Sequence, residues 1–155
     1  MPNHVLNKLI CNDRQIFDTI IKKHFRIVND GEFDSIEFDF NSIIPEPEYT
    51  HEGDWYKWRI DNWGTKWNAY GTEIDENAIY FYTAWSASGP VIYELSKLYP
   101  MAIFELVYCD VDDIGSHYGR VSFNNGNFIF DSNYNGHCDL ICQILGIEYE
   151  DCIDE

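Results

Sequence analysis

The chain has 155 residues, of which 45% are hydrophobic and 17% aromatic, and its 27 acidic against 10 basic side chains give a formal net charge of -17. This length is typical of one domain with one core, and the ring-rich composition excludes a disordered chain. So negative a chain disfavours direct binding to DNA or RNA, because such binding needs Lys and Arg to neutralise phosphates.

The negative charge is concentrated in the second half. Residues 67–155 hold 15 acidic side chains and only two basic ones, Lys97 and Arg120. Such a field attracts a basic partner and speeds its association. The alternative is that the acidity only keeps an aromatic-rich protein in solution.

Signals for membrane insertion and for secretion are absent from the sequence. It has no run of about 18 apolar residues, and its N-terminus lacks the basic and apolar regions of a signal peptide. We therefore expect a soluble, intracellular protein.

The five cysteines are an odd number without the spacing of a secreted disulfide scaffold, so they are predicted to be free thiols. Cys138 and Cys142 would share a helix face beside His137. A zinc site needs four ligands, however, and no second pair is present. Structural thiols are therefore expected, with no metal and no cofactor.

In the first half, His4–Ile10 has apolar residues on both faces, which predicts a central strand. Asn12 is the expected N-cap of a helix over Asp13–His24. Residues Ser35–Phe40 alternate strictly and predict a strand with its apolar side chains inward. The two prolines of 43–47 predict an anchored loop.

Four of the five tryptophans fall within residues 55–67, so we expect these rings to be buried. A helix is predicted from Thr50 or Glu52 to about Asn62, with Gly64 as its C-terminal cap. We interpret this region as a structural motif, comprising Trp63, Gly64, Trp67, Asn68 and Trp85. The alternative is a ligand site in which the rings stack on a base or sugar.

The second half predicts further strands and helices, with Ser86 or Ser88 capping the first helix and Asn124-Asn125-Gly126 forming a hairpin turn. In chain order these elements are strands at 66–70 and 78–85, a helix ended by Pro100, a strand at 101–108, hairpin arms at 117–123 and 127–131, and a short helix at 138–145.

This order predicts an α+β fold, an antiparallel sheet with helices packed on one face, of the ferredoxin-like type. One domain is expected over residues 1–155. It comprises an N-terminal strand-helix-strand portion at 1–50, a ferredoxin-like core at 51–131 and an acidic tail with a short helix at 132–155.

Several motifs over residues 1–130 resemble the YubB-like family, small proteins of phages, plasmids and other mobile elements with a ferredoxin-like domain. The motifs are Met1-Pro2-Asn3-His4-Val5 with Asn7, Ile43-Ile44-Pro45-Glu46-Pro47, Asn62 to Ala69, Phe81 to Ser86, and Gly119-Arg120 before Asn125-Gly126. Two features depart from the family: residues 87–89 separate Ser86 from Pro90, and the acidic tail is less typical. The resemblance implies a fold and a bacterial host cell, with cytoplasmic localisation, and no established activity.

Catalytic signatures are missing: there is no nucleophile elbow, phosphate-binding loop or dinucleotide fingerprint. Asp110, Asp112, Asp113 and His117 form the one group that suggests a metal or acid/base site, although their spacing is not that of a calcium loop. Cys109 is expected to be buried at a strand end, which argues against a nucleophile paired with His117.

We therefore expect a non-enzymatic, acidic binding protein that occupies the basic nucleic-acid-binding surface of a host defence nuclease, of the anti-CRISPR or anti-restriction type. Its partner is a basic protein surface, with no direct nucleic acid and no membrane. The expected contact residues are Asp110, Asp112, Asp113, Glu148, Glu150, Asp151 and Asp154. The alternatives are a metal-dependent, phosphodiester-processing enzyme and a small-ligand regulatory module.

Overall fold

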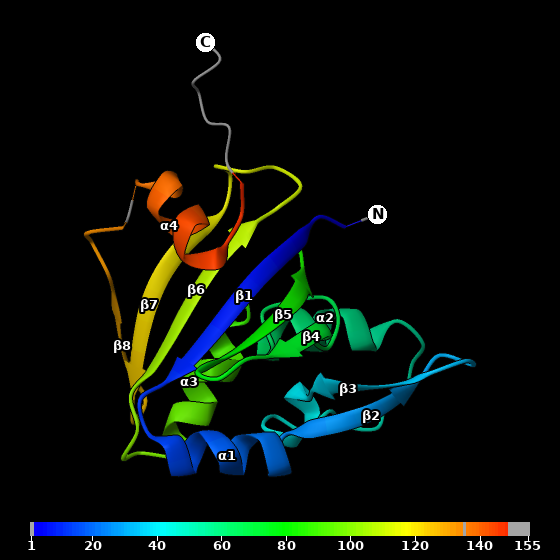
Figure 1. Ribbon diagram of the computed structural model, residues 1–155. Coiled ribbons are helices and arrows are strands. Elements are labelled where there is room, and N and C mark those ends of the chain that lie inside the picture. Colours follow the sequence, from blue (N-terminus) through cyan, green and yellow to red (C-terminus); the bar gives the residue numbers. More distant parts are fainter. Residues whose placement is uncertain (1, 135, 149–155) are drawn as a thin grey trace.

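The computed structural model describes residues 2–134 and 136–148 and contains a six-stranded antiparallel sheet in the order β4-β5-β1-β6-β7-β8 (Figure 1). Its strands are β1 (His4–Cys11), β4 (Tyr70–Ile74), β5 (Ala78–Ala84), β6 (Phe104–Asp110), β7 (Tyr118–Asn124) and β8 (Asn127–Phe130). With four α-helices the fold is α+β, which confirms the predicted class.

The core of the fold follows the ferredoxin-like order. β1, α1 (Arg14–Lys23), β4, β5, α3 (Gly89–Leu98) and β6 succeed one another as strand, helix, strand, strand, helix, strand. In the sheet β1 lies between β5 and β6, so it is the central strand that its two apolar faces predicted. The N-terminal portion therefore supplies one strand and one helix to the same unit as residues 51–131.

A second, smaller sheet is inserted between α1 and β4, and it projects away from the main sheet (Figure 1). It consists of β2 (Phe25–Asn29), which was not predicted, and β3 (Asp34–Phe38). The expectation that the apolar residues of 35–40 all point inward is wrong for Ile36, which is 59% exposed. Ile36 pairs with Ile27 on the projecting hairpin, and Ile27 is exposed too.

The rest of the insertion comprises a short 3-10 helix (Phe40–Ser42) and α2 (Asp54–Asn62). Phe38 and Phe40 are fully buried where this segment returns to the main sheet. α2 ends as predicted, because Gly64 has a left-handed backbone (φ 78) and its N–H donates to the carbonyl of Arg59 at 3.0 Å.

Several predicted boundaries needed correction, including the start of α2, which is Asp54 and not Thr50 or Glu52. The N-cap of α1 is Asp13, whose side chain accepts the N–H of Ile16, while the side chain of Asn12 instead accepts the N–H of Ile103. The strand expected at 66–70 begins only at Tyr70, and the one expected at 101–108 begins only at Phe104. In both cases a residue just before the strand makes a hydrogen bond outside the sheet. The side chain of Asn68 accepts the N–H of Phe40, and the N–H of Ile103 donates to the side chain of Asn12.

Helices cover both faces of the sheet, which corrects the expectation that they pack on one face. α1 and α3 pack on one face, against a main core that includes Leu106. α4 (Cys138–Leu145), whose predicted bounds are confirmed, packs on the opposite face beside the next residue of β6, Val107. The second core under α4 consists of Val107, Cys109, Cys138, Ile141, Cys142 and Leu145.

Among the described residues, no helix has the length and apolar character needed to cross a membrane.

Candidate functional site

Asp110, the first of the expected contact residues, is held inside the protein. Its carboxylate is 4% exposed, and it accepts the backbone N–H groups of Asp112 and Asp113, each at 2.9 Å. Its second oxygen accepts the side-chain amide of Asn3 at 3.0 Å. A carboxylate engaged by three donors shapes the loop after β6 and is not free to meet a partner, which corrects the expectation for Asp110.

Asp112, Asp113 and Glu148 are exposed, as a contact role requires. The Asp112 carboxylate also accepts the backbone N–H of His4 at 2.5 Å, which ties the β6–β7 loop to the start of β1. The other expected contact residues, Glu150, Asp151 and Asp154, lie outside the described residues.

The fold brings these exposed carboxylates to one end of the sheet, where α4, the β6–β7 loop and residues 146–148 lie together (Figure 1). Ile114 from the loop and Ile147 from beyond α4 both pack on the second core. We call this region the acidic end and define it by Asp112, Asp113, Asp139 and Glu148. Sequence reasoning missed Asp139, which is exposed in the first turn of α4.

Among residues 2–134 and 136–148, the acidic end lacks cationic partners. The two basic side chains of residues 67–155 are already engaged, Lys97 with Glu94 at 3.1 Å and Arg120 with Glu105 at 2.8 Å. In the described part of the chain, no ion pair involves a carboxylate of the acidic end. Burial, together with the nearby Asp112 charge, raises the pKa of Tyr70 to about 12. The negative field at this end is therefore uncompensated within the described protein.

The alternative acid/base or metal group does not assemble. The carboxylate of Asp110 already accepts three N–H groups. The ring of His117 turns to the face of the sheet that α3 covers, where it accepts the backbone N–H of Ala87. Over residues 2–134 and 136–148, the only three-residue group of His, Cys, Asp or Glu close enough to hold one metal ion is formed by cysteines.

The tryptophan region divides into buried and exposed rings. Trp63 is 1% exposed, packs edge-on against Phe40 and Trp58, and donates its indole N–H to the carbonyl of Ile44 at 3.0 Å. Trp85 is 48% exposed and has a left-handed backbone (φ 72). The expected burial of the tryptophan rings is thus right for Trp63, while Trp55, Trp58 and Trp67 are half-buried.

Two further members of the structural motif, Asn68 and Trp67, make contacts with neighbouring residues of the protein. The side chain of Asn68 accepts the N–H of Phe40 at 2.9 Å and donates to Asp39 at 2.9 Å, which joins the insertion to the main sheet. Trp67 is half-buried and carries the ammonium of Lys66 over its ring at 5.0 Å. These contacts account for the polar residues of the motif without a ligand.

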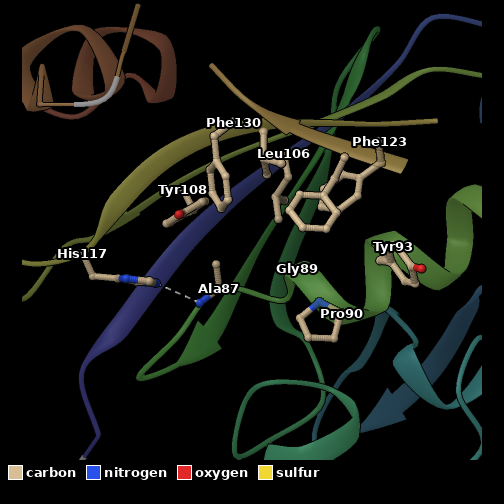
Figure 2. Close-up of a pocket in the computed structure, with 11 residues that line it drawn as sticks. Ala87, Gly89, Pro90, Tyr93, Leu106, Tyr108, His117, Phe123 and Phe130 are labelled. Carbon is tan, nitrogen blue, oxygen red and sulfur yellow. Dashed lines mark hydrogen bonds between the residues drawn. The ribbon is translucent and has the colours of Figure 1, made fainter. Parts of the chain in front are cut away.

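A further concave feature lies elsewhere, between α3 and the strands β6, β7 and β8. We call it the apolar cleft; its volume is about 470 Å³. Figure 2 shows Leu106, Phe123 and Phe130 on the sheet side, facing Pro90 and Tyr93 of α3. The cleft stays open because β8 extends beyond the cover of α3, and Phe130 is left 61% exposed.

One end of the cleft carries two polar rings, His117 and Tyr108, whose centroids lie 4.9 Å apart. His117 Nε2 accepts the N–H of Ala87 at 3.2 Å (Figure 2), so its proton is on Nδ1. Burial lowers the pKa of His117, against an opposing effect of Asp110, so the neutral ring is favoured. Tyr108 lies across Gly119, where an added Cβ would stand 2.6 Å from its hydroxyl. The cleft therefore combines apolar walls with fixed hydrogen-bonding groups, the usual make-up of a small-ligand site.

Sequence reasoning missed this cleft, although one signal was present. The second arm of the hairpin, Asn127–Phe130, is apolar at three successive positions, so it cannot hide all its side chains on one face. In the structure Phe128 and Phe130 face the cleft and Ile129 faces the other way, all three exposed.

The cysteines that can hold a metal ion are Cys109, Cys138 and Cys142, which we call the cysteine cluster. Their sulfur atoms all lie within 4.8 Å of one another. The pairing of Cys138 with Cys142 on one helix face was predicted, but the approach of Cys109 from β6 was not. Burial raises the pKa of Cys138 to about 11 and also raises the pKa of Cys109, so these thiols are protonated at neutral pH.

Comparison with known proteins gives a family match. The model of the family described as a ferredoxin-like domain in Api92-like protein matches residues 62–140. That span includes every residue that lines the apolar cleft, and it stops before Cys142 and Glu148. No curated protein and no solved structure matches the chain.

Proposed function

This chain belongs to the family described as a ferredoxin-like domain in Api92-like protein, and we propose that it is a non-enzymatic, acidic binding protein of a phage or mobile element. Its acidic end occupies the basic nucleic-acid-binding surface of a host defence nuclease complex, of the anti-CRISPR or anti-restriction type. It acts in the cytoplasm of the bacterial host, and it binds no nucleic acid itself.

The observation that supports this proposal is the uncompensated charge of the acidic end. Asp112, Asp113, Asp139 and Glu148 are exposed and outside the ion pairs of the described residues. Clustered carboxylates offer Lys and Arg the charge-assisted hydrogen bonds that phosphates otherwise accept. The sequence adds four more carboxylates after Glu148, at Glu150, Asp151, Asp154 and Glu155.

The test uses purified CRISPR effector and restriction complexes, with their binding to target duplex DNA as the readout. We expect the protein to displace DNA from one of them, and the displacement to weaken as NaCl rises from about 0.05 to about 0.5 M, where screening acts within a few ångströms. Inhibition that is unchanged over this range would show that charge mimicry is not the mechanism.

Paired variants locate the surface. Asp113→Asn with Glu148→Gln removes two charges at the acidic end, and Glu73→Gln with Glu76→Gln removes two exposed charges at the β4–β5 turn. We expect only the first pair to weaken inhibition, by about tenfold, which corresponds to about 1.4 kcal/mol. Equal losses from both pairs would mean that net charge acts without a defined surface.

The apolar cleft favours a second candidate function, a small-ligand regulatory module. The supporting observation is a cavity of about 470 Å³ between aromatic walls, with the Nδ1 proton of His117 at one end. Its ligand is a small, mostly apolar molecule with one hydrogen-bond acceptor.

A fluorescent apolar dye tests the cleft. Phe130→Ala removes a ring that faces it, and Ile129→Ala, the neighbour on the opposite face of β8, is the matched control. We expect dye binding to fall in the first variant alone. If both variants bind the dye as the natural protein does, the cleft is not the binding site.

A further inference from the structure

The cysteine cluster is built from two elements far apart in the chain. Cys109 lies on β6, on the face that α4 covers, and is 0% exposed. Cys138 and Cys142 are one helical turn apart on α4 and are 9% and 1% exposed. The packing of α4 on the sheet therefore aims three sulfur atoms at one point in the second core.

We propose that Cys109, Cys138 and Cys142 form a binding site for one soft metal ion, held by three thiolates, and that this ion is Cu(I). The proposal concerns the cysteine cluster alone and does not depend on the proposed partner of the acidic end.

The distances match such a site. Three sulfur atoms that surround one ion in a plane, each at about 2.3 Å from it, lie about 4.0 Å from one another. In the protein the sulfurs of Cys138 and Cys142 are 3.9 Å apart, and all three lie within 4.8 Å. An ion can therefore enter with side-chain rotations and without a change in the backbone.

The number and type of ligands select the ion. Thiolates are soft ligands, which favour Cu(I), zinc and iron–sulfur clusters over hard cations. Structural zinc is almost always held by four ligands. In the described part of the chain no His, Asp or Glu joins the three sulfurs, and His137 at the start of α4 is exposed. Three thiolates in a buried site suit Cu(I), which is satisfied by three ligands.

Burial keeps the thiols of Cys109 and Cys138 protonated until an ion binds, and the position of Cys138 partly opposes that effect. Cys138 is the first residue of α4, where the positive end of the helix dipole lies. Each thiol that binds Cu(I) releases one proton to solvent, and copper keeps its oxidation state. Affinity should therefore rise with pH.

The metal-free protein is titrated with Cu(I) under anaerobic conditions, in a buffer with a non-thiol reductant and a chromophoric Cu(I) chelator as competitor. We expect one ion per chain, a new charge-transfer absorption in the ultraviolet, and slower loss of the three buried thiols to iodoacetamide over a prolonged incubation, during which local opening exposes them in the metal-free protein. A chain that fails to compete with the chelator, or whose thiols stay equally reactive, would show that the cluster is only packed thiols.

Variants identify the ligands. Cys142→Ser should weaken Cu(I) binding by at least about 100-fold, because one of three ligands is lost. Cys11→Ser with Cys152→Ser leaves the cluster as the only thiols, and this double variant should still bind one ion with unchanged affinity. Circular dichroism checks that each variant is folded, and the iodoacetamide experiment on the natural chain needs no variant. Loss of binding in the double variant would overturn the assignment.

Discussion

At the scale of single residues, Asp110 and Asp113 differ in kind although they belong to one acidic run. Asp110 accepts three N–H groups in the interior, whereas the Asp113 side chain is exposed. The two residues count equally in the net charge of the chain, yet only Asp113 places its charge on the protein surface. The charge of a segment therefore overstates the charge that it presents to a partner.

Asp110→Asn should destabilise the protein by about 1–3 kcal/mol, because the new amide group would face the donor amide of Asn3 and leave it unsatisfied. Urea unfolding followed by circular dichroism measures the change. Asp113→Asn, in the same loop, is the control and should have almost no effect. Equal effects of the two variants would contradict the structural role of Asp110.

His117 makes the stability depend on pH. Burial lowers its pKa from the ordinary value of 6.5. Below about pH 6.5 the unfolded chain therefore binds more protons than the folded chain, and the free energy of unfolding falls as the pH drops. The loss is complete once the pH lies below the folded pKa. His24, whose pKa burial also lowers, contributes in the same direction.

We expect His117→Gln to flatten this dependence, by at most about 1.4 kcal/mol per pH unit, because an amide does not titrate in this range. The Gln carbonyl can accept the N–H of Ala87 in place of the imidazole. Urea unfolding of both proteins at about pH 7.5 and about pH 5.5 gives the two slopes. Identical slopes would mean that His117 is already accessible to protons in the folded state.

At the scale of elements, Gly64 joins the end of α2 to the start of α3. Its left-handed backbone (φ 78) ends the helix, and an added Cβ would stand 2.9 Å from two ring carbons of Pro90. A proline ring in the first turn of a helix has little freedom to move away. Gly64 is thus required both by its conformation and by the space available.

Gly64→Ala should cost about 2–4 kcal/mol, the sum of left-handed strain and overpacking. Gly53→Ala is the matched control, because Gly53 also has a positive φ (96) but has nothing within 4 Å of the added carbon. It should cost only about 1–2 kcal/mol. Thermal unfolding of the two variants measures the difference, and equal costs would show that Pro90 moves aside.

Elements with local signals were predictable from the sequence. α4 and the hairpin turn at Asn125-Gly126 follow from neighbouring residues, and both residues of the turn have the positive φ that it needs. β2 was missed because its partner β3, not its own five residues, makes it a strand. The start of β4 was misplaced because Asn68 is fixed by contacts with Phe40 and Asp39, which are distant in the chain.

The candidate sites likewise divide into those with a local signal in the sequence and those that form only through contacts between distant segments. The exposed aspartates of the β6–β7 loop could be read directly as an acidic run. The cysteine cluster could not, because it needs α4 to pack over β6, and no spacing between Cys109 and Cys138 encodes that contact. The apolar cleft likewise depends on β8 reaching beyond α3.

At the scale of the whole molecule, the net charge of -17 opposes compaction, because like charges approach one another on folding. Raising NaCl from about 0.05 to about 0.5 M should therefore stabilise the protein, with a melting temperature higher by roughly 3–6 °C, or about 1–2 kcal/mol. Scanning calorimetry measures the shift. Glu73→Gln with Glu76→Gln should reduce it, and a shift that is absent or negative would show that the ion pairs outweigh repulsion.

The place of β1 also has a consequence for synthesis on the ribosome. β1 is made first, yet it pairs with β5 and β6, which end at Ala84 and Asp110. As the chain emerges, Val5 and Leu9 have no sheet to enter until those later strands leave the exit tunnel. The β1 segment therefore stays unpaired through much of synthesis, and it gains its two partners in turn, first β5 and then β6.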